Sequence, residues 1–151
     1  MSEIEIKIKR LKKKFSDIPL PSYSTKGSAG MDIRAAINNE IVLDKGKIGL
    51  IPTNLSVEIP EGYEIQVRPR SGLALKHGIG ILNSPGTIDS DYRGEIKIII
   101  MNFSDKDFVI KRGDRIAQLV VSKVYPARLI EADDLNESNR GEGGFGHTGK
   151  V

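Results

Sequence analysis

The sequence predicts an all-β domain of the sandwich, barrel or jelly-roll type. Many short extended runs follow one another at a spacing of about 8 to 12 residues, which is typical of such folds. Turn-forming residues separate these runs, and a helical period is almost absent. The chain has 151 residues, 38% of them hydrophobic, which is enough for one packed core and too few for a two-domain enzyme.

The strands are expected in order along the chain. The first is predicted where Ile4, Ile6 and Ile8 alternate with charged residues, the pattern of a half-buried strand with one charged face. One short helix is expected at residues 71–77, with Ser71 as a potential N-cap and a glycine after its last turn. Further extended runs are predicted at residues 31–37, 40–43, 47–51, 55–59, 63–68, 95–103, 108–110 and 115–124.

The final stretch of the chain breaks the strand pattern. Residues 131–139 are polar, and the residues after them include five glycines with no apolar period. We therefore predict two parts, a β core of residues 1–130 and a flexible C-terminal arm with a Gly-rich lid at residues 131–151. A Gly-rich segment that carries Arg140 and Phe145 could close over an anionic, aromatic ligand.

Charge, cysteine content and hydropathy exclude several classes of function. The 23 Lys and Arg against 20 Asp and Glu give a net charge of +3, and the excess lies in residues 1–14. A solvated strand edge explains this basic cluster more simply than a nucleic-acid site, which stays the alternative. The chain has no Cys, which excludes disulfides, a thiol nucleophile and Cys-bound zinc. Apolar runs reach only about five residues against the roughly 20 of a membrane span, so we expect a soluble, cytoplasmic protein with no membrane or nucleic-acid partner.

Four places combine residue types that suit ligand binding, and each also has a simpler structural interpretation. Arg68–Gly72 places two guanidiniums before the amide-rich start of the short helix, which favours phosphate. Asp32 follows a glycine and would by itself be an ordinary turn residue. Residues 85–94 put two carboxylates and Tyr92 in a hairpin tip, where turn chemistry alone also predicts Asp and Gly. Gln118, in an otherwise apolar strand, is either an edge residue facing solvent or a polar group aimed at a ligand.

Taken in order, these segments and the tail resemble the five motifs of the homotrimeric deoxyuridine triphosphate nucleotidohydrolases (dUTPases). The motifs read A-G-M-D-I at 29–33, R-P-R-S-G-L-A at 68–74, L-N-S-P-G-T-I-D-S-D-Y-R-G-E-I at 82–96, R-G-D-R-I-A-Q-L at 112–119 and R-G-E-G-G-F-G-H-T-G at 140–149. The resemblance covers about residues 20 to 149. It implies a jelly-roll or distorted β-barrel fold and a homotrimer with shared active sites.

The resemblance also implies a reaction, the hydrolysis of dUTP to dUMP and pyrophosphate by Mg²⁺-assisted attack of water on the α-phosphorus. This activity keeps uracil out of DNA and supplies dUMP for dTMP synthesis. Asp89 matches the catalytic carboxylate that activates the water, a role suited to an ionised general base. Asp32 is similar to the carboxylate that holds Mg²⁺ through a water. Substrate-binding positions of the family match Arg70, Ser71, Gly72, Asn83, Thr87, Ile88, Tyr92, Lys97, Gln118, Arg140, Phe145, Gly146 and Thr148.

The resemblance divides these positions by the part of the nucleotide they would contact. Asn83 and the main chain around Lys97 would bind the uracil edge, and Tyr92 would pack under the deoxyribose, where a 2′-hydroxyl has no room. Phe145 would stack on uracil. The helix start, Gln118 and the tail would bind the phosphates. In the resembling family the hairpin comes from one chain, the phosphate motifs from a second and the tail from a third.

Two other functions compete with this interpretation. The dCTP deaminases share the fold but place an essential Glu ten residues after the Asp of the hairpin, where this chain has Ile99. A nucleotide-binding or regulatory protein that kept the dUTPase fold is the second alternative. No motif position is visibly damaged, which favours a working enzyme.

Overall fold

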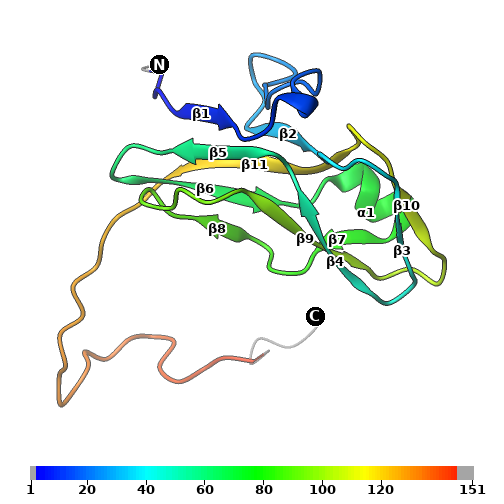
Figure 1. The fold of residues 1–151 in the computed structure, drawn as a ribbon. Coiled ribbons are helices and arrows are strands. Elements are labelled where there is room, and N and C mark those ends of the chain that lie inside the picture. The colour runs from blue at the N-terminus through cyan, green and yellow to red at the C-terminus, as the bar shows by residue number, and fades with distance from the viewer. Residues whose placement is uncertain (1–2, 146–151) are drawn as a thin grey trace.

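The computed structural model describes residues 3–145, and most of their regular structure is β-strand (Figure 1). The strands of this part are β1 (Lys7–Arg10), β2 (Gly30–Arg34), β3 (Ile41–Leu43), β4 (Ile48–Pro52), β5 (Leu55–Glu58), β6 (Tyr63–Arg68), β7 (Ile79–Ile81), β8 (Gly86–Ile88), β9 (Lys97–Asn102), β10 (Phe108–Ile110) and β11 (Arg115–Lys123). An α-helix, α1 (Ser71–His77), and a 3-10 turn, η1 (Lys13–Phe15), accompany them. The predicted all-β class with one very short helix is confirmed.

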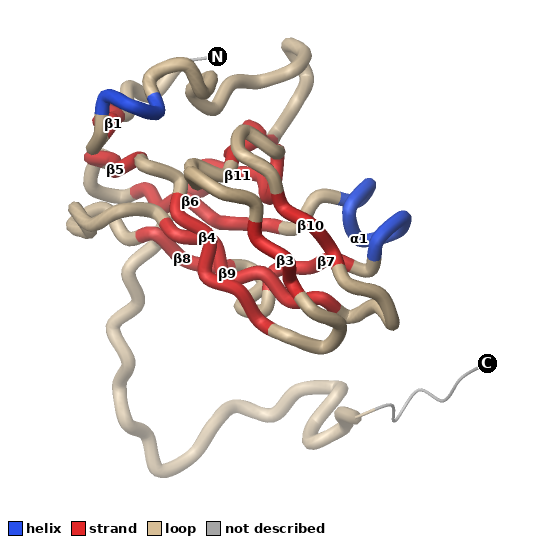
Figure 2. The backbone as a smooth tube through the Cα atoms, turned by 45° about the vertical axis from the view of Figure 1, so that its right-hand side comes forward, coloured by secondary structure: helices blue, strands red, loops and turns tan. Residues whose placement is uncertain are grey.

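Two antiparallel sheets form the body of the protein. The first has the strand order β2-β11-β6-β8 and the second has the order β4-β9-β7. Two smaller pairs, β1 with β5 and β10 with β3, lie beside them (Figure 2). Strands that pair come from distant parts of the sequence, as β11 does between β2 and β6, which is the connectivity of a jelly roll. Within residues 3–145 the sheets do not close into a barrel.

Alternating side chains of the strands supply the core. Ile98 and Ile100 of β9 are fully buried and belong to one apolar cluster with residues of both sheets. Asn102, at the end of β9, is also fully buried, and its side-chain amide donates to the carbonyl oxygens of Leu43 and Lys106 at 2.9 and 2.8 Å. These bonds satisfy a polar group in an apolar interior, so β9 is held rigidly.

The short helix α1 begins and ends close to the predicted positions. Gly78 has a φ of 63°, and its amide donates to the carbonyl of Ala74 at 3.0 Å, which ends the helix in the left-handed conformation that glycine favours. The expectation that Ser71 is the N-cap is wrong. Ser71 is the first helical residue, and Arg70 occupies the cap position with an extended backbone and no side-chain cap bond.

The first predicted strand differs from the structure. Strand β1 begins only at Lys7, and Ile4 and Ile8 are 40% and 37% exposed, while only Ile6 packs partly against the core. The strand pairs with β5 alone, at one edge of the body, so it has no second layer to bury an apolar face. The alternation therefore predicts the strand correctly, but the prediction that one face of it is buried is wrong.

Two strands lie where none was predicted. Strand β7 contains only Ile-Gly-Ile, and β8 contains Gly-Thr-Ile inside the segment expected to be a hairpin tip. Each is three residues long, which is too short for a periodic signal. Ile88 of β8 pairs with Ile65 of β6 and is buried, so packing against β6 holds this segment as a strand.

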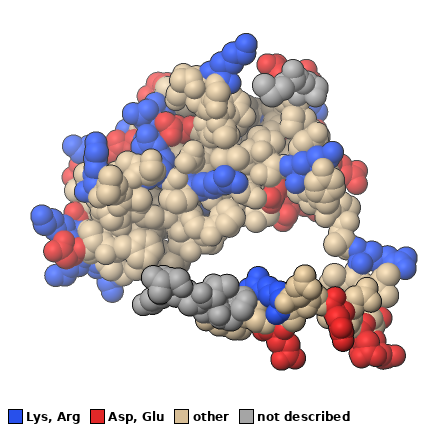
Figure 3. Space-filling model, turned by 180° about the vertical axis from the view of Figure 1, so that it is seen from behind, with Lys and Arg blue, Asp and Glu red and all other residues tan. Residues whose placement is uncertain are grey.

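The C-terminal arm follows β11 and runs outside the body. Residues 124–145 include no strand or helix; the amide of Val124 still donates to the carbonyl of Gly62 at 2.8 Å, and the arm beyond it runs away from the sheets (Figure 1), separated from the body by open space (Figure 3). Apolar side chains on the arm are exposed, among them Leu129 and Leu135. The division at residues 130 and 131 stays a prediction. Among the described residues, no helix is long and apolar enough to cross a membrane.

Candidate active site

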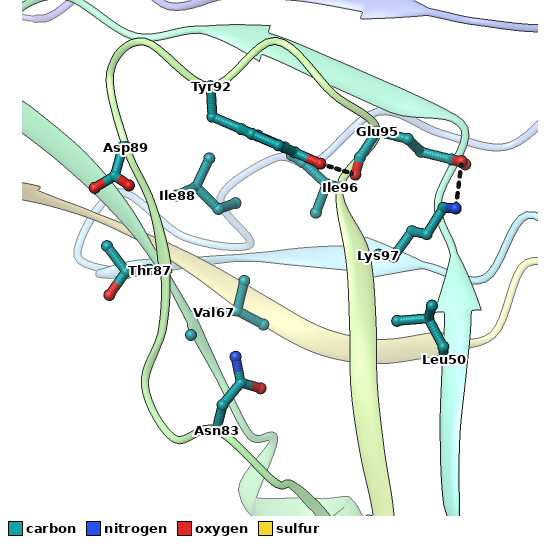
Figure 4. A pocket seen from close by; sticks show the side chains of 11 residues that line it. Leu50, Val67, Asn83, Thr87, Ile88, Asp89, Tyr92, Glu95, Ile96 and Lys97 are labelled. Atoms are coloured by element: carbon teal, nitrogen blue, oxygen red, sulfur yellow. Dashed lines mark hydrogen bonds and ion pairs between the residues drawn. The ribbon is translucent and has the colours of Figure 1, made fainter.

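A pocket of about 410 Å³ opens at the free edge of β8, between the two main sheets (Figure 4). We call it the hairpin pocket. Its walls come from β6 and β8 on one side and from β4 and the start of β9 on the other. The lining residues are Leu50, Val67, Asn83, Gly86, Thr87, Ile88, Asp89, Tyr92, Glu95, Ile96 and Lys97. The segment 83–97 therefore contributes most of the pocket, and its role in ligand binding stays a prediction.

Asp89 stands at the rim of the hairpin pocket because the buried Ile88 before it is anchored in the core. The carbonyl of Asp89 accepts a hydrogen bond from the amide of Tyr92 at 3.2 Å, which fixes the turn that follows. The residue is exposed, so its carboxylate can contact water. A carboxylate on a rigid turn beside a nucleotide-sized pocket is suited to orient a water molecule.

The ring of Tyr92 extends along one wall of the hairpin pocket (Figure 4). Its hydroxyl donates to the main-chain oxygen of Glu95 at 3.0 Å. The side chain of Glu95 lies 3.9 Å from the Nζ of Lys97 and accepts the amide of Asn54 at 2.9 Å. These contacts connect the hairpin to β9 on the far side of the pocket. Asn83 lies at the end of the pocket away from Tyr92, and its side chain is exposed, so it can contact a ligand (Figure 4).

A second polar group lies at the other end of the sheet β2-β11-β6-β8. Asp32 of β2 pairs with the Nε of Arg70 at 2.8 Å and with Nη1 of Arg115 at 3.3 Å. Arg70 also donates to the carbonyl of Arg115 at 3.2 Å, and Gln118 donates from Nε2 to the carbonyl of Pro69 at 2.9 Å. We call Asp32, Arg70, Arg115 and Gln118 the Asp32 cluster. It stands directly before the N-terminus of α1, where Ser71 and Gly72 present main-chain amides.

These contacts decide two alternatives that the sequence left open. Asp32 is not a turn residue, because it lies within β2 and forms two ion pairs. Gln118 is not an edge residue, because β11 lies between β2 and β6 in the middle of the sheet. Both side chains are half-buried. The expected convergence of the first, second and fourth motifs is therefore present in the fold.

The Asp32 cluster and the hairpin pocket lie toward opposite edges of one sheet, since β11 and β6 separate β2 from β8. Gln118 is paired directly with Asp32 on one side and with Arg68 on the other, so these three side chains share a face. Val67 precedes Arg68 along β6 and therefore points to the other face, where it lines the hairpin pocket. Thr87 of β8 is paired with Gln66 and so shares the face of Arg68 and Gln118, which means that residues of both faces line the pocket at this edge.

The arm residues stand apart from both groups. Nε of Arg140 donates to the carbonyl of Gly143 at 2.6 Å, within the arm itself, and Phe145 is exposed. In the described part of the chain, no residue of the arm lines the hairpin pocket. Gly146 and Thr148 lie outside the described residues.

Two residues near the site were not singled out from the sequence. Arg115 looked like the first residue of a strand, and its contact with Asp32 becomes apparent only when β11 pairs with β2. Glu95 looked like the polar end of an apolar run, and its contacts link it to Lys97 and Asn54. The only signal for either was its position inside a motif.

Residues 3–145 include no cluster of three or more acidic or His side chains that could hold a metal. Asp32 is a single carboxylate between two guanidiniums. A divalent cation could be held there only if a ligand supplied most of its oxygen atoms, which the phosphates of a nucleotide can do. The donor set therefore fits a metal that arrives with its substrate.

Comparison with known proteins agrees with this geometry. The sequence model of one protein family, dUTPase, matches residues 16–149.

The chain belongs to the dUTPase family.

It is 51% identical over 150 residues to the deoxyuridine 5′-triphosphate nucleotidohydrolase of Fusobacterium nucleatum, a match that covers 99% of this chain and 100% of the relative. It is 60% identical over 131 residues to the enzyme of the same name from Chlamydia pneumoniae, covering 86% of this chain and 90% of the relative. Among solved structures, the dUTPase of Staphylococcus bacteriophage 80alpha with dUPNHPP superposes with a TM-score of 0.85 at 29% identity, covering 96% and 98% of the two chains. The jelly-roll fold expected for a dUTPase is thus confirmed.

Proposed function

We propose that this protein is a dUTP diphosphatase, which hydrolyses dUTP to dUMP and pyrophosphate, keeps uracil out of DNA and supplies dUMP for dTMP synthesis. The observation that carries this proposal is the hairpin pocket, in which Asp89, Tyr92 and Asn83 meet on the motif that defines the family resemblance. The curated relatives at 51% and 60% identity are named for this reaction.

The proposed chemical step uses Asp89 as a general base. Its carboxylate accepts a proton from a water molecule, and the oxygen of that water attacks the α-phosphorus. The bond from the α-phosphorus to the bridging oxygen then breaks, and pyrophosphate leaves with the bonding electron pair. The exposure of Asp89 and the hydrogen-bonded turn after it support this role, because the base must reach water and keep its orientation.

Base and sugar recognition is assigned to the walls of the hairpin pocket. Asn83 and the main chain at Lys97 face each other across the pocket and would bind the uracil edge. Thr87 and Ile88 form the β8 wall between them. Tyr92 would lie under the deoxyribose, where its ring leaves no room for a 2′-hydroxyl.

Phosphate and metal binding is assigned to the Asp32 cluster and the arm. Arg70, the amides of Ser71 and Gly72, and Gln118 would hold phosphate oxygens. Asp32 would hold Mg²⁺ through a water; when bound, the ion neutralises phosphate charge and orients the triphosphate. The arm would close over the site. Phe145 would stack on uracil, and Arg140, Gly146 and Thr148 would contact the phosphates.

We further propose a homotrimer with shared active sites. The separation of Asp32 from the hairpin pocket by two strands supports this assembly, because a second copy can bring its own Asp32 cluster to the pocket. The outer face of β4 and β9 also favours self-association. Ile48 and Leu50 are 56% and 58% exposed there, beside the half-buried Met101 and Ile99. Leu50 also lines the hairpin pocket, so the apolar face continues into the site.

The same apolar face argues against the deaminase alternative. Ile99 is paired with Leu50 and occupies the position at which a deaminase would carry its Glu. An aliphatic side chain cannot transfer a proton. The cytoplasmic location and the absence of a nucleic-acid partner stay predictions from the sequence.

Two measurements test the proposal. Purified protein with Mg²⁺ is offered dUTP, dCTP, dTTP and UTP, and we expect dUTP to release pyrophosphate most rapidly. Hydrolysis in ¹⁸O-water should then place the label in dUMP and none in pyrophosphate. Label in pyrophosphate would refute attack at the α-phosphorus, and binding of dUTP without hydrolysis would favour the regulatory alternative.

A further inference from the structure

The ring of Tyr92 lies directly over Gly94, two residues further along the hairpin. A Cβ atom built on Gly94 would overlap the Tyr92 hydroxyl and would lie 2.5 Å from Cζ and 2.9 Å from Cε2 of the same ring. Real Cβ atoms do not approach other atoms so closely. The position of the Tyr92 ring therefore requires a residue without a side chain at position 94.

The backbone gives no other reason for this glycine. Several glycines of the described chain have a positive φ, which disfavours any other residue, but Gly94 is not one of them. A positive φ is therefore not the reason for glycine at position 94. The tyrosine ring is thus the steric obstacle to a side chain at this position.

Tyr92 is 46% exposed, so its ring can move aside, and the cost of that movement is a lost hydrogen bond. Its hydroxyl donates to the carbonyl of Glu95 at 3.0 Å, and this bond holds the ring along the pocket wall (Figure 4). A methyl group on residue 94 would displace the hydroxyl end of the ring and break the bond to Glu95. The wall of the hairpin pocket would then lose its defined shape at Tyr92.

We propose that Gly94 is a positioning residue that sets the Tyr92 ring and, through it, the preference for a 2′-deoxyribonucleotide over a ribonucleotide. This inference rests on the proposed function, in which Tyr92 excludes the 2′-hydroxyl. With alanine at position 94, the displaced ring leaves space beneath C2′, so kcat/KM for UTP rises relative to kcat/KM for dUTP.

The test compares kcat/KM for dUTP with kcat/KM for UTP in the full-length protein. Gly94→Ala should lower the ratio at least about tenfold, because selectivity depends on the fit of one hydroxyl. Gly27→Ala is the matched control, since a Cβ there meets nothing within 4 Å and its φ is not positive. That control should keep the ratio of the wild type. An unchanged ratio in Gly94→Ala, or an equal fall in the control, would overturn the proposal.

A double-mutant cycle separates the ring from other effects of residue 94. In a Tyr92→Ala background the obstacle is absent, so adding Gly94→Ala should change the ratio no further. A further fall of similar size would show that Gly94 acts without Tyr92 and would overturn the proposal. If Gly94→Ala alone fails to fold, the double variant should fold, because it lacks the clash. Failure of both to fold would contradict a role through the ring.

The position of the Tyr92 ring can also be monitored by NMR, without an activity assay. In ¹³C-NMR spectra of protein with labelled tyrosine rings, the Tyr92 signal is identified by its loss in Tyr92→Phe. It should shift in Gly94→Ala and stay in place in Gly27→Ala. A Tyr92 signal that does not move would refute the contact. A wild-type protein that does not prefer dUTP would contradict the proposed function, while this spectrum would still decide whether Gly94 positions the ring.

Discussion

Complementation between two inactive chains tests whether the arm of one subunit closes the site of another. The first chain is truncated after Asn139, which removes the Gly-rich end and Arg140. The second is full-length and carries Asp89→Asn. The truncated chain should still assemble, since its sheets and its apolar outer face are intact. Each protein alone lacks one part of every site, so each should be nearly inactive.

The expected recovery follows from the arrangement of the arm. The arm leaves the body after Lys123, and its described residues do not line the hairpin pocket of their own chain. If hairpin and arm come from different subunits of a trimer, every trimer that contains both kinds of chain has one of its three sites with an intact Asp89 and an intact arm. Trimers that contain both kinds of chain should therefore show about a third of wild-type turnover. If the arm served its own chain, no site would contain both parts.

The assay needs proof of mixing. The two chains carry different affinity tags, are unfolded and refolded together, and are purified over both tags in sequence. Pyrophosphate release from dUTP is then measured at saturation and compared with each parent refolded alone. Verified mixed trimers with no gain over the parents would refute donation of the arm between subunits, and closure within one chain would replace it.

Four further predictions follow from the site and its surroundings. Asp89→Asn should lower kcat at least about a hundredfold with dUTP binding largely kept, since general base assistance supplies about 10²- to 10⁴-fold; lost binding with normal kcat would make Asp89 a substrate ligand. Tyr92→Ala should raise the relative rate on UTP, and unchanged selectivity would contradict ribose exclusion by the ring. Leu50→Lys should shift the protein from trimer to monomer in analytical ultracentrifugation, whereas Leu75→Lys, on an exposed position of α1, should leave the assembly unchanged. The hydrogen bond from Arg112 lowers the pKa of Asp17, so this stabilisation is present above the unfolded-state pKa and is lost as pH falls through the folded-state value. Asp17→Asn should therefore lower the urea midpoint at pH 7, and the difference from the wild type should shrink as the pH falls below the ordinary range of an Asp carboxyl; a difference of the same size at low pH would exclude the ion pair as the cause.

Strand prediction succeeded where the chain carried a periodic pattern and failed where packing alone holds a segment. Strands β6 and β11 agree with the runs of apolar residues in the sequence. Strand β8 was missed, because Gly-Thr-Ile after a proline has the composition of a turn. It becomes a strand because Ile88 pairs with Ile65 and is buried. Such a pairing joins residues far apart in the chain, so a local pattern cannot contain it.

The candidate site shows the same division between local and distant information. The hairpin residues from Asn83 to Lys97 are contiguous, so one motif was enough to identify the pocket they line. Arg115 could not be recognised in this way. Its carboxylate partner lies 83 residues away, and only the pairing of β11 with β2 brings the two together.

The sequence by itself determined the all-β class and the short helix; the separate C-terminal arm and the roles of the site residues stay predictions from it. These features depend on residue type and on spacing within one segment, and both can be read from the sequence. Only the tertiary structure decided that Asp32 is ion-paired, that Gly94 lies under Tyr92, and that Val67 and Arg68 face opposite ways. Side-chain direction depends on strand register, and a shift of one residue would turn each side chain to the other face. Register is set by the partner strand and the core, so it exists only in the folded protein.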